Sequence, residues 1–145
     1  MKPRSWSLPL CLLLGAVPAV PAPVAQATKA TLEWGGQYGG DPSPGAEGVM
    51  DAGQWGRLWR RLGRQAPPLD FTRYCAVVAF AGRRPTGGFT IEFLPPVPQG
   101  KDLLVRWRVR PPSPQSYVTE AFAQPWHIKA FPRPAGGVKV ERRDP

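Results

Sequence analysis

The chain contains few residues that could carry out catalysis. It has one histidine, His127, and two cysteines, of which Cys11 lies in an apolar amino-terminal stretch and Cys75 opens a second apolar run. His127 alternates with Trp126 and Ile128, so we expect its side chain on the solvent face of a strand, without a positioned catalytic partner. Cys75 in an apolar run is typical of a small buried hydrophobe. We therefore expect that the chain is not an enzyme.

Metal and cofactor sites are not expected either. One histidine and one mature cysteine supply too few nitrogen and sulfur ligands for a zinc site. The glycine pairs Gly35-Gly36 and Gly87-Gly88 lack the spacing of a phosphate-binding loop. The sequence therefore predicts no metal and no cofactor.

One loop, residues 82–89, has unusual backbone chemistry. Pro85 fixes one φ angle, and Gly87 and Gly88 can adopt the positive φ that other residues avoid. The Thr86 hydroxyl can bond nearby backbone and hold the turn. Such a loop can join two strands tightly, bind a partner, or do both.

The amino-terminal end has the layout of a signal peptide. Lys2 and Arg4 precede an apolar stretch from residue 6 to 20, and Ala25-Gln26-Ala27 offers a cleavage site. The apolar stretch is too short to span a bilayer of about 30 Å as a helix. We expect residues 1–27 to be a signal peptide and the mature chain to be secreted or periplasmic, with no transmembrane segment after cleavage.

Residues 28–145 are expected to form a single β-rich domain. Their number, roughly 118, lies in the range of single domains that bury one modest core. Cys75 is the only cysteine in this part, so no internal disulfide can form. The formal charge of the whole chain is +9, which becomes +7 without the two basic residues of the signal peptide. A basic surface suits an acidic partner, an anionic envelope or nucleic acid, although nucleic acid is not the expected partner of an exported chain.

One amphipathic helix is predicted after Asp51, which can cap it. Trp55, Leu58, Trp59 and Leu62 follow the spacing of a single apolar stripe, and arginines occupy the other positions. A basic helix with tryptophans could lie on a membrane surface. In a small β domain, the interpretation that it covers the sheet is favoured.

The rest of the chain shows the alternation of strands. Residues 76–81 are almost wholly apolar and predict a central strand that is covered on both faces. The other predicted strands are residues 30–34, 89–93, 103–109, 117–123, 126–131 and 138–141. Together they indicate a mainly β (α+β) domain, a small antiparallel β-sandwich or curled sheet with one amphipathic helix packed on it.

The strand at residues 103–109 bears on nucleic-acid binding. Trp107 alternates with Arg106 and Arg108, so the ring and the guanidinium groups should lie on opposite faces. A stacking platform for single strands needs both on one face, which disfavours that function. Glu92 on the preceding strand is expected to pair with Arg106 or Arg108.

Ordered motifs resemble the PrcB C-terminal domain family over most of residues 49–131. They are the helix with Trp55 and Trp59, Leu69-Asp70-Phe71, Phe80-Ala81-Gly82, Arg84-Pro85-Thr86-Gly87-Gly88-Phe89-Thr90-Ile91, the strand from Val105 to Pro111, and Gln124-Pro125-Trp126-His127-Ile128. The family is named for a subunit associated with a secreted protease complex. The resemblance implies an interaction or stabilising module without catalysis, whose partner is another exported protein such as a protease.

A second, looser similarity concerns the chagasin-like inhibitors of cysteine proteases. These immunoglobulin-like sandwiches use loops of the N-P-T-T-G-[YF] and R-P-W kinds, which residues 84–89 and 124–127 match in part. Two such loops at one end of a sandwich could enter a protease cleft. A third alternative is a basic surface that binds the envelope or nucleic acid. The candidate partner-binding residues are Arg84, Pro85, Thr86, Gly87, Gly88, Phe89, Pro125 and Trp126.

Overall fold

The computed structural model describes residues 32–144, which belong to one compact unit. The predicted signal peptide lies outside the described residues. The elements are β1 (Glu33–Gly36), β2 (Gly45–Val49), α1 (Ala52–Arg61), β3 (Tyr74–Phe80), β4 (Thr90–Phe93), β5 (Val97–Gln99), β6 (Asp102–Arg110), β7 (Trp126–Pro132) and β8 (Val138–Arg142). None of the helices in this described part is long and apolar enough to cross a membrane.

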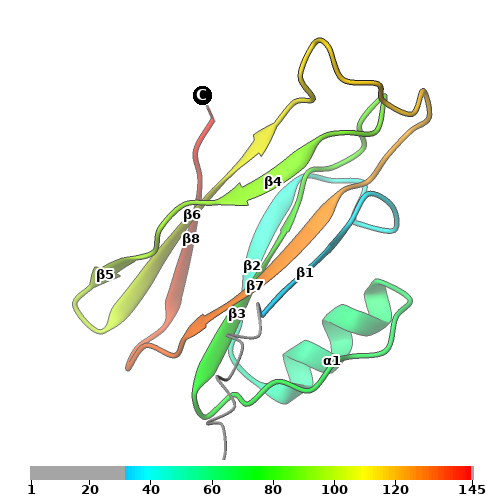
Figure 1. Cartoon of the computed structure of the whole chain (residues 1–145). Coiled ribbons are helices and arrows are strands. Elements are labelled where there is room, and N and C mark those ends of the chain that lie inside the picture. Colours follow the sequence, from blue (N-terminus) through cyan, green and yellow to red (C-terminus); the bar gives the residue numbers. More distant parts are fainter. Residues whose placement is uncertain (1–31, 145) are drawn as a thin grey trace, which may run out of the picture. The chain divides into compact units, whose positions relative to one another are not determined.

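Two sheets and one helix make three layers (Figure 1). The first sheet has the order β1-β7-β3-β2, with every neighbouring pair antiparallel. In the second sheet β4 and β5 pair antiparallel with β6, and β8 pairs parallel with it. The second sheet packs on one face of the first, and α1 covers the other face. The predicted fold class, a small β-sandwich with one helix packed on it, is confirmed.

Strand β3 is buried on both faces, as its apolar sequence predicts. Ala76, Val78 and Phe80 contribute to the core beneath α1. Val77 and Ala79 point the other way, into the core between the two sheets. Because both faces are covered, none of the positions from 75 to 80 has to meet water.

Helix α1 begins where the sequence predicts. The Asp51 carboxylate accepts a 2.8 Å hydrogen bond from the Gln54 N–H, which satisfies one free donor of the first turn. The apolar stripe of Trp55, Leu58 and Trp59 is buried against the first sheet. The sheet-covering interpretation of this helix is therefore confirmed.

Aromatic rings fill the core beneath the helix. The Trp59 ring lies 5.4 Å from the Trp55 ring, 6.1 Å from Trp34 and 5.8 Å from Trp126, in edge-to-face geometry. Gly36 makes room for this cluster, since a Cβ there would lie 2.9 Å from the Trp126 indole nitrogen. Strand β1 thus extends past the predicted end at residue 34, because Gly35 and Gly36 pair with His127 and Trp126 of β7.

Three features of the strands differ from the prediction. Residues 117–123 are not a strand, because only Ala123 pairs, through an isolated bridge to Arg84. Strand β2 was not predicted: two of its five residues are glycines, and its pairing with β3 creates it. The short strand β5 was also not predicted. Tyr117, Ala121 and Phe122 of the 117–123 segment are exposed, whereas Ala123 is buried, so the apolar residues of this segment do not mark one buried face.

Candidate partner-binding surface

Three loops gather at one end of the sandwich, at the upper right of Figure 1. They are residues 37–44 between β1 and β2, residues 81–89 between β3 and β4, and residues 111–125 between β6 and β7. We call them together the three-loop end. It includes the segment 84–89 that the sequence singled out and residues 124–125 of the segment 124–127, whose last two residues open β7.

Backbone hydrogen bonds hold the second and third loops side by side. The Arg84 N–H donates to the Ala123 carbonyl at 2.8 Å, and the Ala123 N–H donates to the Arg84 carbonyl at 2.9 Å. The Gly87 N–H donates to the Thr119 carbonyl at 2.9 Å. At the base of the loops, the Ala81 N–H donates to the Pro125 carbonyl at 3.0 Å. The two loops therefore form one continuous surface.

Gln37 ties the first loop to the other two. Its side-chain amide donates to the Phe89 carbonyl at 2.8 Å, and its side-chain oxygen accepts from the Gly88 N–H at 3.2 Å. Its own carbonyl accepts from the Gln124 N–H at 2.9 Å. Sequence reasoning missed Gln37, because a glutamine between a strand and a glycine turn gives no sign of its distant partners.

Several of the predicted site residues hold the loops rather than face solvent. The Arg84 guanidinium donates to the Ala81 carbonyl at 3.0 Å and lies 5.2 Å from the centre of the Phe89 ring. The Thr86 hydroxyl donates to the neighbouring Gly87 carbonyl at 3.1 Å, as expected. Pro85 and Gly88 are exposed, whereas Gly87 is buried and Arg84, Thr86 and Phe89 are half-buried.

The other two predicted residues, Pro125 and Trp126, are buried. The Trp126 ring belongs to the core beneath α1, and its indole N–H donates to the Tyr38 carbonyl at 3.0 Å. Trp126 therefore positions the first loop from inside, and only 3% of it is exposed for contact with a partner.

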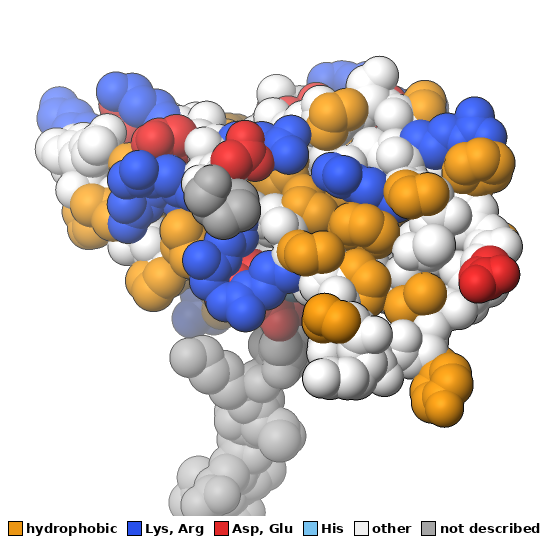
Figure 2. All heavy atoms as spheres, turned by 90° about the horizontal axis from the view of Figure 1, so that it is seen from above, with side chains coloured by type: hydrophobic (Ala, Val, Ile, Leu, Met, Phe, Trp, Pro, Cys, Tyr) orange, Lys and Arg blue, Asp and Glu red, His pale blue; other side chains and the backbone are white. Residues whose placement is uncertain are grey.

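The exposed aromatic residues of the three-loop end were not predicted as site residues. Tyr38 is 52% exposed, Phe122 is 63% exposed, and Tyr117 protrudes fully. Figure 2 views the molecule from above, and hydrophobic side chains are numerous on the right-hand half of that face. Tyr117 and Phe122 were not predicted to be exposed, because residues 117–123 were predicted to form a strand.

Tyr38 and Phe122 border a recess of about 280 Å³. Its other lining residues are Gly39, Arg83 and Gln124. The Arg83 guanidinium stacks on the Phe122 ring, 3.9 Å from its centre. Aromatic rings and arginines are enriched among residues that dominate binding energy at protein interfaces. The recess is therefore the part of the three-loop end with the composition of a protein contact.

The Gly87-Gly88 pair allows a test of the loop geometry. Gly88 has φ +84°, and a Cβ there would lie 2.8 Å from a Val118 methyl carbon and 2.9 Å from Pro112. At Gly87 the nearest atom would be 3.6 Å away, an ordinary contact. We expect Gly88→Ala to lower the free energy of unfolding by about 2 kcal/mol, and Gly87→Ala to change it by less than about 0.5 kcal/mol. Urea unfolding measures both, and equal effects would contradict this geometry.

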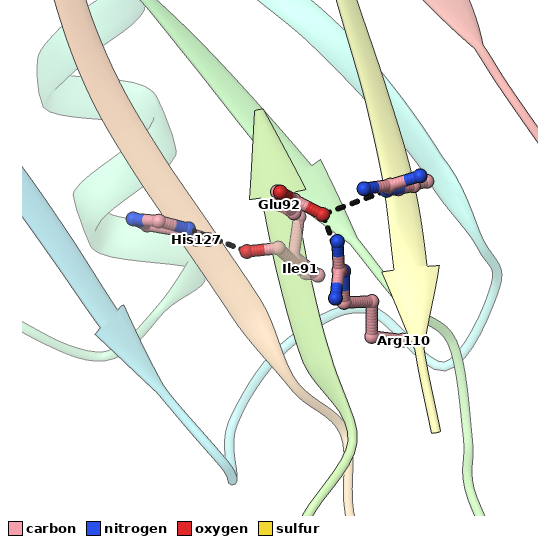
Figure 3. A network of polar contacts seen from close by, with 5 residues as sticks. Ile91, Glu92, Arg110 and His127 are labelled. Atoms are coloured by element: carbon pink, nitrogen blue, oxygen red, sulfur yellow. Dashed lines mark hydrogen bonds and ion pairs between the residues drawn. The ribbon is translucent and has the colours of Figure 1, made fainter. Parts of the chain in front are cut away.

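His127 is not on a solvent face, contrary to the prediction. It does point away from Trp126, but this second face of β7 packs against the second sheet, so the side chain is half-buried. Its Nδ1 lies 3.0 Å from the Ile91 carbonyl (Figure 3), and its ring lies 5.2 Å from the Phe93 ring. Because a carbonyl only accepts, Nδ1 donates. His127 thus links the two sheets beside a groove of about 340 Å³ between β1, β4 and β7.

Cys75 is fully buried, and its thiol lies 3.7 Å from the Phe131 carbonyl. Burial is the main cause that raises the pKa of this thiol above its ordinary value. The thiol therefore stays neutral at a pH where an exposed cysteine forms the reactive thiolate.

We expect Cys75 to react with a disulfide reagent at pH 8 only as fast as the protein opens, and at once in denaturant. Because burial raises the pKa of the Cys75 thiol in the folded state, the contribution of the neutral thiol to the free energy of unfolding is fully present below the ordinary cysteine pKa. It is lost as the pH rises from there through the folded-state pKa. The rate at which Cys75 reacts is measured from the absorbance of the thiol that the reagent releases. Fast labelling of the native protein would contradict the burial of Cys75.

Charged residues form a stripe on the outer face of the second sheet. Glu92 bonds to Arg108 at 2.6 Å and also to Arg110 (Figure 3). Hydrogen bonds from Arg108 and then Arg110 lower the pKa of the Glu92 carboxyl. The predicted pairing with Arg108 is confirmed. Trp107 is 2% exposed and lies on the inner face, away from these arginines, as predicted.

Part of the chain matches a known protein family. Residues 75–132, less than half of the chain, match the model of the family described as PrcB C-terminal. The predicted family resemblance is confirmed. The PrcB C-terminal match covers the second and third loops, with Arg83 and Phe122. It begins at residue 75 and therefore does not include β1 or the first loop. No curated protein matches this chain, and no solved structure matches it.

Proposed function

We propose that this chain is an exported, non-catalytic protein-interaction module that binds a partner protein through the three-loop end. The observation that carries the proposal is the recess in which Tyr38, Phe122 and Arg83 are exposed together on loops fixed by hydrogen bonds. Exposed aromatic side chains on a rigid base are typical of binding surfaces, since ordering them costs little entropy.

The PrcB C-terminal match supports a partner within a protease complex. The family name refers to a subunit of such a complex, and the match covers two of the three loops. The signal-peptide layout of residues 1–27 supports export. We therefore propose that the partner is another exported protein, with a protease as the first candidate.

The non-catalytic part of the proposal rests on two side chains. The Nδ1 atom of His127 is engaged by a backbone carbonyl rather than by a carboxylate or a nucleophile. Cys75 is buried between the sheets, and burial raises the pKa of its thiol, which disfavours the reactive thiolate. Among residues 32–144, no group of three or more histidine, cysteine, aspartate or glutamate side chains could hold a metal ion.

A protease inhibitor is the second candidate function, favoured by one observation. Residues 84–89 and 124–127 lie side by side, as an inhibitor acting through both loops requires. The burial of Trp126 means that Pro85 and Phe122, rather than the indole, would enter a protease cleft. The nucleic-acid alternative is less well supported, because Trp107 and the arginines of β6 lie on opposite faces.

Two measurements separate these candidates. An interaction module should retain a defined exported protein from envelope extracts, and a variant of the three-loop end should not retain it. An inhibitor should reduce the activity of papain-like or subtilisin-like proteases at micromolar concentration. Full protease activity together with specific retention supports the module. Inhibition supports the second candidate, and absence of both results overturns the proposal.

A further inference from the structure

Two adjacent arginines at the three-loop end differ in their surroundings. Arg84 is half-buried, and its guanidinium bonds to the Ala81 carbonyl and contacts the Phe89 ring. Arg83 is exposed, and only its backbone N–H is bonded, to the Pro42 carbonyl at 2.9 Å. Among the described residues, no hydrogen-bond acceptor or carboxylate pairs with the Arg83 guanidinium. Arg84 therefore serves the loop, and Arg83 remains available for a ligand.

The position of the Arg83 guanidinium is defined even though it has no polar partner. It stacks on the Phe122 ring at 3.9 Å, and the recess that it lines is closed on another side by Tyr38. The main chain of Tyr38 is held in turn by the hydrogen bond from the Trp126 indole N–H to the Tyr38 carbonyl. A stacked guanidinium keeps the N–H groups at its edge free for hydrogen bonds in its own plane.

The charges near the recess leave its positive charge uncompensated. Asp41, on the first loop, lies 3.9 Å from Arg61 of α1 and forms an ion pair with it. Glu120, on the third loop, makes no ion pair within the described part of the chain. A carboxylate from outside that enters between the two rings would meet the free N–H groups of Arg83, and hydrogen bonds between two charged groups are stronger than those between neutral groups.

From this arrangement we propose that the recess binds a carboxylate of the partner protein, carried by an aspartate or glutamate between apolar residues. The carboxylate accepts two hydrogen bonds from Arg83, and the apolar neighbours contact Tyr38 and Phe122. This inference rests on the proposed function and names the chemistry that the three-loop end recognises. The residue that selects the partner is Arg83, which the sequence analysis had not chosen.

Two short peptides test the inference directly. Both have the core Ala-Leu-Xaa-Leu-Ser with blocked ends, and Xaa is glutamate in one and glutamine in the other. They are titrated into the purified full chain while the arginine side-chain N–H signals and aromatic ring signals are followed by NMR. We expect the glutamate peptide to shift the Arg83, Tyr38 and Phe122 signals, and to bind about tenfold more tightly than the glutamine peptide.

Variants provide matched controls. Arg83→Gln should remove the preference for glutamate, and Lys101→Gln, an exposed cation at the turn between β5 and β6, should keep it. Because Arg83 is exposed and its side chain makes no hydrogen bond or ion pair among the described residues, only the stacking contact with the exposed Phe122 ring, Arg83→Gln should unfold close to the wild-type temperature.

The outcomes distinguish this inference from the proposed function. If both peptides shift the loop signals with equal affinity, or if Arg83→Gln keeps the preference, carboxylate recognition is wrong and the interaction surface stands. If neither peptide shifts any signal at residues 37–44, 81–89 or 111–125, this inference fails as well. The proposed function then fails only if no exported protein is retained through these loops.

Discussion

Replacement of Trp59 by alanine is expected to lower the free energy of unfolding by about 3–5 kcal/mol, the usual cost of removing a large buried aromatic ring. The Trp59 ring is 4% exposed and contacts the rings of Trp34, Trp55 and Trp126. Its loss opens a cavity between α1 and the first sheet. Because Trp126 also bonds to the Tyr38 carbonyl, the cavity should loosen the first loop. Urea unfolding followed by circular dichroism measures the effect.

Phenylalanine variants supply the control. The Trp59 indole N–H is buried without a hydrogen-bond partner, whereas the Trp55 N–H donates to the Pro67 carbonyl at 2.8 Å. Trp59→Phe therefore removes an unsatisfied donor, and Trp55→Phe leaves a carbonyl without its partner. We expect Trp59→Phe to cost less stability than Trp55→Phe. The reverse order would show that the helix core is packed differently.

The second large effect concerns binding. Replacing both Tyr38 and Phe122 by alanine should weaken binding of the partner by about 100-fold, because a few central aromatic residues carry most of the energy at an interface. Both rings are more than half exposed, so the fold should tolerate their loss. Surface plasmon resonance with the partner recovered from envelope extracts measures the affinity.

Val97 provides the matched control for these apolar substitutions. It is also an exposed apolar residue, 36% exposed, but it lies on β5, away from the three loops in Figure 1. Val97→Ala should leave affinity within about twofold of the wild type, as for surface substitutions outside an interface. An equal loss of affinity for the partner in Val97→Ala and in the double variant would indicate a general change in the protein rather than the loss of a local contact at Tyr38 and Phe122.

The sequence predicted those elements whose pattern reflects burial. The stripe that contains Trp55 and Trp59 predicted α1 and its buried face, and the apolar run at residues 76–81 predicted a central strand. Strand β2 escaped prediction because pairing with β3, not its own composition, makes it a strand. Residues 117–123 resembled a strand because they include aromatic and β-branched residues, yet Tyr117 and Phe122 are exposed and only Ala123 pairs, through one isolated bridge.

His127 shows that a sequence pattern can predict the correct face of a strand and still give the wrong exposure of the side chain. It lies opposite Trp126, as predicted, but β7 is an inner strand with α1 on one side and the second sheet on the other. Alternation places a residue on a face, and only the tertiary structure says what covers that face. The same reasoning could not show that Arg83 is exposed to solvent and that Arg84 is half-buried.

Photo-crosslinking in the producing cells tests the central claim most directly, since it reports which surface touches another protein. The variants Phe122→p-benzoylphenylalanine and Val97→p-benzoylphenylalanine place the same probe at two exposed apolar positions. We predict that, after irradiation, the probe at residue 122 is joined to one exported protein, and that the probe at residue 97 is not. Crosslinking from residue 97 alone, or from neither position, would contradict the account.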